Sequence, residues 1–389
     1  MNKRIWASAI AFLVFISSVI PLGIINAKGA VPDVSSKSAI LMEASTGEVI
    51  YEKLSDEKMP PASITKVMTL ILIFEALDRG DIKLEDMVST SAEAAGMGGS
   101  NVYLEEGETL TVDDMIKCIA ISSANDASYA MGERIGGTIE NFVEMMNNKA
   151  KELGMNNTHF VNCHGLDEEN HYSTARDVAI MSRELITKHP EISKYSTTWM
   201  DTIIHKTKRG EKEFGLSNTN KLVRTYDGIT GLKTGSTTKA GYCLSATATR
   251  EDVSLIAVVM SSKDHKTRFV DCKTLLDYGF SNCKVYMSDV AGKYYEIKIN
   301  KGKTDKIYGK AHKEFQKVFV GKDNSENVRY EVEILDEIDA PIDKNAVVGY
   351  IIFYENDDEI GRLEIYSTSE VKKAEYMDCI KRVLFVFFT

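Results

Sequence analysis

The sequence predicts a mixed α/β (α+β) domain followed by a small all-β domain. Strand-like runs lie near residues 45 and 250, on either side of a mostly helical stretch. This order favours one sheet, built from both ends of the domain, with helices packed on it. Beyond about residue 284, short alternating runs separated by polar turns indicate strands.

Length and charge agree with two ordinary globular domains. The chain has 389 residues and a formal net charge of −10 at pH 7. At roughly 100–200 residues per domain, this length suggests two domains with a substantial core. An acidic chain lacks the basic face that neutralises phosphates, so we expect no nucleic-acid partner.

The N-terminus has the pattern of an export signal. Lys3 and Arg4 precede a long apolar run, which closes on small residues ending at Ala27. We therefore expect residues 1–27 to be a signal peptide cleaved near Ala27. An uncleaved membrane anchor is the alternative, because the apolar run is long for a signal. Either form places the working part of the protein outside the cytoplasm.

The first domain is expected over residues 30–282. It opens with a hairpin over 39–53 around a Thr-Gly turn. Residues 67–77 are apolar on nearly every side, which predicts a buried central helix. Three further helices are expected to begin after the capping residues Thr111, Thr138 and Ser173. The domain closes with two β-rich runs within 241–262 and a helix over 268–278.

The second domain is expected over residues 285–370, with strands only. Residues 371–389 then show a helical pattern with aromatic and aliphatic side chains on one face and lysines elsewhere. This segment is too short and too interrupted to span a bilayer, so we expect an interfacial helix that attaches the exported protein peripherally to the outer face of the membrane. A helix docked on its own domain is the alternative.

The cysteines and histidines indicate no metal or cofactor. Six cysteines are scattered without a CxxC pair, and the seven histidines form no HxxxH or HxH cluster. Most of the cysteines are expected to be small buried hydrophobic residues. A disulfide between Cys272 and Cys283 is left open, because export can expose them to an oxidising environment.

One of five Ser-x-x-Lys matches stands out. Only Ser63, followed by Lys66, lies at the start of a strongly apolar helix. Spacing of i,i+3 places the two side chains on one helix face. A buried lysine favours its neutral form and can accept the serine proton. Alone, however, the pattern is better explained as a helix start after a proline-rich loop.

Two other short motifs strengthen the catalytic interpretation. Ser123 and Asn125 form a Ser-x-Asn at the end of one predicted helix, while a second such match, Ser325-Glu326-Asn327, lies in a polar turn of the β domain. Lys233-Thr234-Gly235 occurs once, just before a β-rich run. Three motifs in this order, each at the end of an element, are far more specific than any one of them.

With these motifs the sequence resembles the penicillin-recognising serine D,D-peptidases, whose active-site motifs are S-x-x-K, S-x-N and K-T-G. It is most similar to the low-molecular-mass D-alanyl-D-alanine carboxypeptidases over about residues 35–280. The stretches PASITKVMT, SSANDAS, NCHGLDEENHYSTARD, NTNKLV and DGITGLKTGSTTKAGYCLSATA carry the resemblance. It implies a β-lactamase/transpeptidase-like domain, with an antiparallel sheet, helices on both faces and a helical subdomain.

The resemblance also implies catalytic roles. Ser63 would attack the carbonyl between two terminal D-alanines and form an acyl-enzyme, with neutral Lys66 as its base. The positive charge of Lys233 would hold down the pKa of Lys66. Ser123 would relay a proton between Lys66 and the leaving amine.

The remaining matched residues would bind the substrate. Asn125 would hold a backbone amide of the peptide, and Lys233 with Thr234 would receive its terminal carboxylate. The backbone N–H groups of Ser63 and Ser236 would form the oxyanion hole. Gly235 would let the strand approach the substrate closely. The implied ligands are peptidoglycan stem peptides and β-lactam antibiotics, with no cofactor.

Three rival functions remain open. A serine β-lactamase shares the motifs, but its E-x-x-L-N stretch is absent, and only Glu168 and Glu169 fall in the right interval. A D,D-endopeptidase and a non-catalytic wall-binding protein are the others. His171 is expected to cap or pack rather than catalyse, and Arg268 to pair with an acid behind the Lys-Thr-Gly strand.

Overall fold

A computed structural model describes residues 31–207, 210–321, 325–335, 338–378 and 380. The predicted signal peptide and most of the predicted C-terminal helix therefore lie outside the described residues. Among the residues that are described, no helix has both the length and the apolar composition needed to cross a bilayer.

The first domain is built on a five-stranded antiparallel sheet, in the order β2-β1-β9-β8-β7. The predicted N-terminal hairpin is confirmed, and its first strand pairs with β9 from the far end of the domain, Ala39 opposite Val259. The sheet thus joins the two ends of the domain, as the sequence predicts. Its strands are β1 (Ser38–Glu43), β2 (Val49–Lys53), β7 (Ile229–Thr237), β8 (Gly241–Arg250) and β9 (Val253–Ser262).

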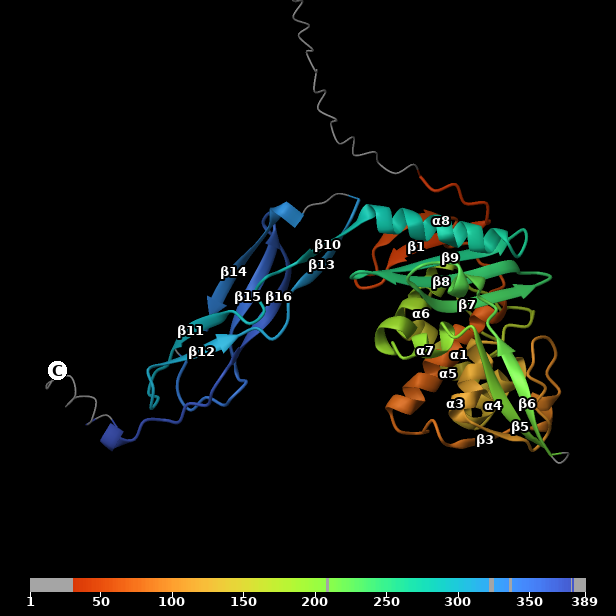
Figure 1. Cartoon of the computed structure of the whole chain (residues 1–389), viewed down its shortest axis with the longest axis horizontal. Helices are drawn as coiled ribbons and strands as arrows, with labels where there is room; N and C mark the ends of the chain where they lie inside the picture. The colour runs from red at the N-terminus through yellow and green to blue at the C-terminus, as the bar shows by residue number, and fades with distance from the viewer. Residues whose placement is uncertain (1–30, 208–209, 322–324, 336–337, 379, 381–389) are drawn as a thin grey trace, which may run out of the picture. The chain divides into compact units, whose positions relative to one another are not determined.

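Helices cover both faces of this sheet (Figure 1). One face packs against α8 (Thr267–Asn282), which begins one residue before and ends four residues after the predicted helix over 268–278. The other face packs against α6 (Ala175–Lys188), with α1 (Lys66–Asp78) next to it. The remaining helices, which form a subdomain around α1, are α2 (Ala92–Ala95), α3 (Val112–Ala120), α4 (Asn125–Gly136), α5 (Ile139–Glu152) and α7 (Ile192–Ser196).

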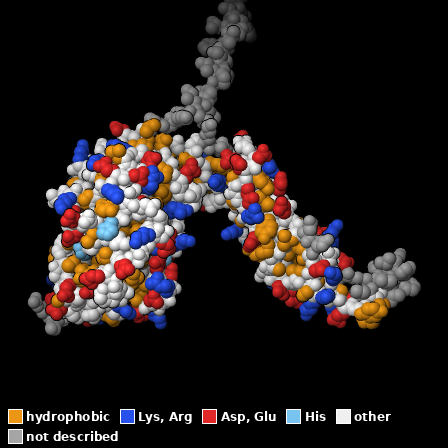
Figure 2. Space-filling model, turned by 180° about the vertical axis from the view of Figure 1, so that it is seen from behind, with side chains coloured by type: hydrophobic (Ala, Val, Ile, Leu, Met, Phe, Trp, Pro, Cys, Tyr) orange, Lys and Arg blue, Asp and Glu red, His pale blue; other side chains and the backbone are white. Residues whose placement is uncertain are grey.

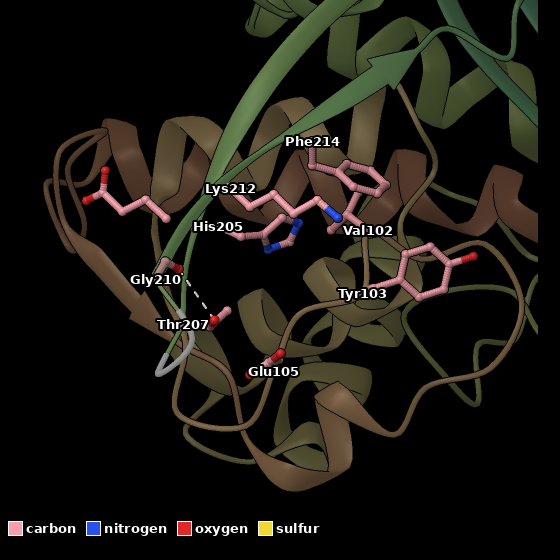
Figure 3. Close-up of a pocket in the computed structure, with 9 residues that line it drawn as sticks. Val102, Tyr103, Glu105, His205, Thr207, Gly210, Lys212 and Phe214 are labelled. Carbon is pink, nitrogen blue, oxygen red and sulfur yellow. Dashed lines mark hydrogen bonds between the residues drawn. The ribbon is translucent and has the colours of Figure 1, made fainter.

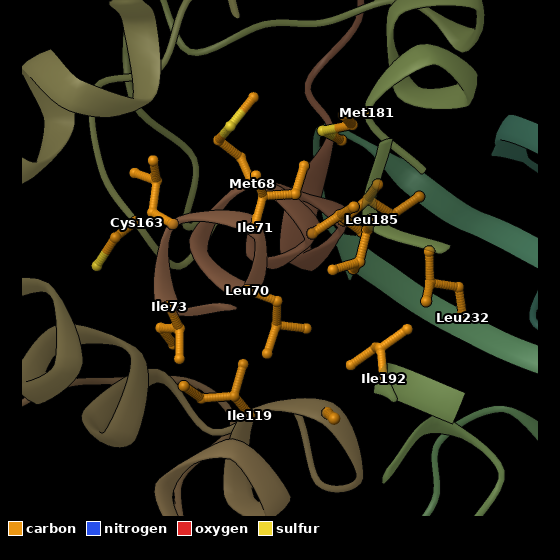
Figure 4. Packing of buried hydrophobic residues seen from close by; sticks show 14 of the residues in the cluster. Met68, Leu70, Ile71, Ile73, Ile119, Cys163, Met181, Leu185, Ile192 and Leu232 are labelled. Carbon is orange, nitrogen blue, oxygen red and sulfur yellow. The ribbon is translucent and has the colours of Figure 1, made fainter. Parts of the chain in front are cut away.

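The central helix α1 is buried as predicted. Ten of its thirteen residues are buried, including its first residue, Lys66. Figure 4 shows its side chains Met68, Leu70, Ile71 and Ile73 pointing to different sides, each toward a neighbouring element. Because α1 is packed on all sides, the residues at its N-terminus are held rigidly in place.

Two of the three predicted helix caps are confirmed. The hydroxyls of Thr111 and Thr138 accept hydrogen bonds from backbone N–H groups in the first turns of α3 and α5. The third prediction is wrong, because Thr174 rather than Ser173 caps α6. Ser173 instead pairs its backbone with Met59 in an isolated β-bridge, so it is fixed in an extended conformation.

Four further strands form two small antiparallel pairs. β3 (Met87–Ser89) pairs with β4 (Thr109–Thr111) across a segment that contains α2, and β5 (Met200–Thr207) pairs with β6 (Gly210–Ser217) in a hairpin. The 3₁₀ turns are η1 (Ala62–Thr65), before α1, and η2 (Lys221–Arg224), before β7.

The C-terminal part is all-β, as predicted. A five-stranded sheet in the order β11-β12-β16-β15-β14 covers its own apolar core, and β10 pairs with β13. The second Ser-x-Asn match lies in the turn η3 (Ser325–Asn327). The strands are β10 (Cys283–Met287), β11 (Tyr294–Lys298), β12 (Lys306–Lys310), β13 (Gln316–Val320), β14 (Val328–Ile334), β15 (Val347–Glu355) and β16 (Asp358–Ser367).

The cysteines of the described residues are buried free thiols. Cys272 and Cys283 are both buried free thiols, so the disulfide between them does not form in this structure. Three other described cysteines are also buried and free, in agreement with the prediction. On the face shown in Figure 2, basic and acidic side chains are interspersed without a large patch of either sign.

Candidate active site

Ser63 lies in η1, the 3₁₀ turn that leads directly into α1. The preceding residue, Ala62, has a positive φ of 49°, which bends the chain sharply before the helix. Lys66 follows one turn later, and its Nζ lies 3.2 Å from Ser63 Oγ. The prediction that the two side chains share one helix face is therefore met by the geometry.

Lys66 is fully buried and firmly held. Its Nζ donates to Asn125 Oδ1 at 2.6 Å and to the carbonyl oxygen of His164 at 2.7 Å. Burial lowers the pKa of Lys66 to about 7, against weaker opposing effects of Cys163 and Asp126. A lysine with this pKa is substantially neutral at neutral pH, as a general base must be.

Ser123 lies in the turn between α3 and α4, and Asn125 is the first residue of α4. Ser123 has a positive φ of 62°, and its buried Oγ has no hydrogen-bond partner among the described residues. Asn125 is bonded on both sides, because its Oδ1 accepts from Lys66 while its Nδ2 donates to Gly98 O at 2.6 Å. This region therefore provides the Ser123 hydroxyl, which is available for a new hydrogen bond, and the Asn125 side-chain amide, which holds Lys66 in position.

The Lys-Thr-Gly motif lies on β7, which is an edge strand of the sheet. A Cβ on Gly235 would lie 2.9 Å from the backbone N of Ser63 and 3.0 Å from Pro61 O. Only a glycine permits this approach of the strand to the serine turn. The next residue, Ser236, is exposed, and Thr234 donates from Oγ1 to Thr219 Oγ1 at 2.7 Å.

Lys233 is almost completely buried, and its Nζ donates to the carbonyl oxygen of Thr234 at 3.0 Å. Burial is the largest cause that lowers its pKa well below the usual range, and repulsion by Lys66 and Arg268 acts in the same direction. The sequence analysis expected both burial and the charge of Lys233 to lower the pKa of Lys66. In the structure, loss of solvation is the largest cause that lowers the pKa of both lysines.

The motifs alone did not reveal several supporting residues. A Cβ on Gly165 would lie 1.9 Å from the carbonyl oxygen of Ala62, so the loop that carries His164 packs directly on the serine turn. Asn162 shapes this loop by accepting from the backbone N of Gly165 at 2.7 Å. The stretch NCHGLD contains these residues, but its contact with η1 is visible only in three dimensions.

His171 and Arg268 support the site from behind. The Nδ1 of His171 accepts from the backbone N of Val161 at 3.0 Å, and its Nε2 lies 2.8 Å from Thr65 Oγ1. This bridging position matches the predicted packing role. Arg268 donates to the carbonyl oxygens of Gly235 and Cys243 at 3.1 and 3.3 Å. The predicted acidic partner for Arg268 is therefore wrong.

Among the described residues, one trio has the spacing to hold a metal ion: Asp78, His189 and Glu191. Asp78 is the last residue of α1, at the opposite end of that helix from Lys66. This trio therefore does not belong to the site around Ser63. Glu168 and Glu169 are both exposed.

The fold and these three converging motifs define a serine acyl-transfer enzyme of the penicillin-recognising class. The sequence profile described as D-alanyl-D-alanine carboxypeptidase matches residues 26–264, and that of the penicillin-binding protein 5 C-terminal domain matches residues 280–373. The chain belongs to the D-alanyl-D-alanine carboxypeptidase family.

Individual relatives agree with this membership. The D-alanyl-D-alanine carboxypeptidase DacF of Bacillus subtilis is 41% identical over 350 residues, which cover 90% of this chain and 89% of the relative. The solved structure of penicillin binding protein 5 from Haemophilus influenzae is 30% identical with a TM-score of 0.67, covering 88% of this chain and 99% of its own. A Streptococcus pneumoniae structure, a peptidoglycan synthesis regulatory factor (PBP3), gives 26% identity and a TM-score of 0.72, covering 87% of this chain and 100% of its own.

Proposed function

We propose that this protein is a serine D,D-carboxypeptidase that removes the C-terminal D-alanine from peptidoglycan stem peptides. One observation carries the proposal most directly. A fully buried lysine, Lys66, lies 3.2 Å from the hydroxyl of Ser63 and has its pKa lowered to about 7. Such a pair activates a serine without a histidine.

Acylation would follow from this pair. Neutral Lys66 takes the proton of Ser63 Oγ as the oxygen bonds to the carbonyl carbon of the penultimate D-alanine. The developing oxyanion is held by the backbone N–H groups of Ser63 and Ser236. When the C–N bond breaks, the proton passes from Lys66 through Ser123 Oγ to the amine of the departing D-alanine. Water then hydrolyses the ester and restores Ser63.

Lys233 and Thr234 would select a free chain end. Burial makes a charged Lys233 costly in the empty site, and an incoming carboxylate offsets that cost. A peptide that continued beyond the terminal D-alanine would bring no such charge. This arrangement favours a carboxypeptidase over an endopeptidase that cuts within crosslinked chains.

Asn125 has a different role in this proposal from the one the motif implied. Both ends of its side-chain amide are already hydrogen-bonded, one of them to Lys66. In this proposal, Asn125 therefore mainly positions the base Lys66. Its Oδ1 retains a second lone pair, so it can still accept a bond from the substrate's amide N–H.

The β-lactamase alternative finds less support. The acids in the relevant interval, Glu168 and Glu169, are exposed, whereas a deacylating base has to reach into the acyl-enzyme site. A related structure, penicillin-binding protein D2 from Listeria monocytogenes, was solved in an ampicillin-bound form and is 33% identical, with a TM-score of 0.56. We infer that β-lactams acylate Ser63 in this protein and that the resulting acyl-enzyme is hydrolysed slowly.

The activity test is direct. The full chain is incubated with a peptide ending in D-Ala-D-Ala, and free D-alanine is assayed beside Ser63→Ala. Release by the wild type alone supports the proposal, and release by neither protein or by both contradicts it. Rapid hydrolysis of penicillin, in place of a lasting adduct, would favour the β-lactamase.

We also propose that the protein is exported and held on the outer face of the membrane by its C-terminal segment. Val371 is buried and exchanges two backbone hydrogen bonds with Ile342, so a deletion should begin beyond it. Removing residues 376–389 should move the exported protein from the membrane fraction to the soluble fraction. Retention on the membrane after this deletion would contradict the attachment.

A further inference from the structure

A pocket of about 530 Å³ opens between the β5–β6 hairpin and the loop between α2 and β4 (Figure 3). This volume is within the usual range for small-ligand sites. None of the residues assigned to catalysis lines it. Its lining includes Val102, Tyr103 and Glu105 from the loop, and His205, Lys212 and Phe214 from the hairpin.

The pocket is built on a buried polar anchor. The side chain of Glu108 is fully buried and lies 2.7 Å from His205 Nδ1. The same carboxylate accepts from the backbone N of Glu105 at 2.9 Å and of Lys206 at 3.3 Å. One carboxylate thus joins the loop to the hairpin, so the two walls hold a fixed separation.

Both walls are tied to the catalytic turn. On the loop, the backbone N–H groups of Val102 and Leu104 donate to the carboxylate of Asp126, the residue after Asn125, each at 3.1 Å. On the hairpin, the backbone N of Ser217 donates to Ser122 Oγ at 3.2 Å. The pocket is therefore positioned relative to the site around Ser63.

The interior combines apolar walls with both signs of charge. Phe214 makes edge contacts with His205 and Tyr103, at centroid separations of 5.3 and 6.1 Å. Tyr103 is 72% exposed, so its ring is available to a ligand. In Figure 3 Lys212 extends across the pocket, with Glu105 on the opposite rim. Among the described residues, neither of these charges forms an ion pair.

We propose that this pocket binds the side chain of the third stem-peptide residue, and that it prefers a diamino diacid whose end carries both an ammonium and a carboxylate group. The proposal rests on the proposed function. Lys212 would bind the carboxylate, Glu105 would bind the ammonium group, and the rings of Phe214 and Tyr103 would pack on the methylene chain.

The occupant has to extend along β6. Phe214 is three residues along this strand from Ser217, which is about 10 Å in a strand. The third residue directly precedes the D-alanine whose carbonyl Ser63 would attack, and one extended residue spans about 3.5 Å. The proposal therefore requires a long third side chain that runs along β6 into the pocket.

The test compares two pentapeptides that differ only at the third residue, with meso-diaminopimelate in one and L-lysine in the other. The full chain should show a kcat/KM about tenfold higher for the diaminopimelate peptide, because only this peptide offers a carboxylate to Lys212. Lys212→Ala should abolish that preference. Glu105→Gln should lower kcat/KM about tenfold for both peptides, since both carry the ammonium group.

Lys188→Ala is the matched control. Lys188 is an exposed lysine at the end of α6 and does not line the pocket. The wild-type preference should persist in this variant. Equal rates for the two peptides with the wild type, or an unchanged preference in Lys212→Ala with an unchanged melting temperature, would overturn the proposal. Absence of D-alanine release from either peptide would instead contradict the carboxypeptidase function.

Discussion

Gly235 and Ser63 come from opposite ends of the first domain, yet a Cβ on Gly235 would lie only 2.9 Å from the backbone N of Ser63. Ile64 N and Pro61 O would be equally close, at 3.0 Å each. All three are backbone atoms of the serine turn, so no side chain can rotate away to make room. The closeness of β7 to the nucleophile therefore depends on this glycine.

Gly235→Ala should consequently separate β7 from the serine turn. A displacement of about 1 Å at a catalytic group can cost roughly 100-fold in rate, so we expect at least that loss in penicillin acylation. The rate constant for acylation by a fluorescent penicillin measures this directly. Gly215→Ala is a suitable control, because a Cβ there would meet no atom within 4 Å. Equal acylation by Gly235→Ala and the wild type would contradict the role of the close approach.

Ser123→Ala should lower activity without lowering stability. The Ser123 hydroxyl is buried and has no hydrogen-bond partner among the described residues, so its removal costs no bond in the folded state. If the hydroxyl relays a proton, kcat for D-alanine release should fall roughly 100-fold. The melting temperature should stay the same or rise slightly. A large fall in melting temperature with normal activity would point to a purely structural role.

The pH dependence of kcat/KM should reveal the pKa of the general base, Lys66. Lys66 acts in its neutral form, and its pKa is lowered to about 7. Below pH 7 the neutral fraction falls about tenfold per pH unit, so kcat/KM should fall with it, and above pH 7 this limb should level off. The measurement is kcat/KM for a D-Ala-D-Ala peptide between pH 5 and 9. A kcat/KM that still rises about tenfold per pH unit up to pH 9, as expected for a lysine of ordinary pKa, would exclude the buried base.

His171→Ala should act on stability rather than on chemistry. His171 bridges the backbone N of Val161 and the hydroxyl of Thr65, and burial lowers its pKa to about 4, so it stays neutral at neutral pH. Losing a buried bridge leaves its partners unsatisfied and should cost about 1–3 kcal/mol in the free energy of unfolding, measured by urea titration. The exposed His265→Ala serves as a control. A catalytic defect in a fully stable His171→Ala would contradict this assignment.

The sequence predicted the N-terminal hairpin, α1 and the residues that meet at the site, but not the strands β5, β6 and β7. Periodicity located α1, and the three motifs located Ser63, Ser123 and Lys233. The expectation that each motif stands at the end of an element is wrong for Lys233, which lies within β7. The sequence also did not predict partners that only tertiary packing selects. Ser173 and Thr174 are equally good caps by type, and an arginine behind a strand can bind carbonyl oxygens as readily as an acid.

The pocket beside the active site could not be predicted from the sequence for the same reason. His205 and Glu108 are 97 residues apart in the sequence, so no local pattern indicates the contact that joins the two walls of the pocket. The boundaries expected at residues 27, 30, 282, 285, 370 and 371 stay predictions.

The most direct test of the central claim is to locate the covalent adduct formed with a β-lactam. The full chain is treated with penicillin, digested, and examined by mass spectrometry. We predict one stoichiometric penicilloyl group on Ser63, formed at least roughly 100-fold more slowly in Lys66→Ala, which removes the base. An adduct on Ser123, or no adduct in a correctly folded protein, would contradict the assignment of Ser63 as the nucleophile.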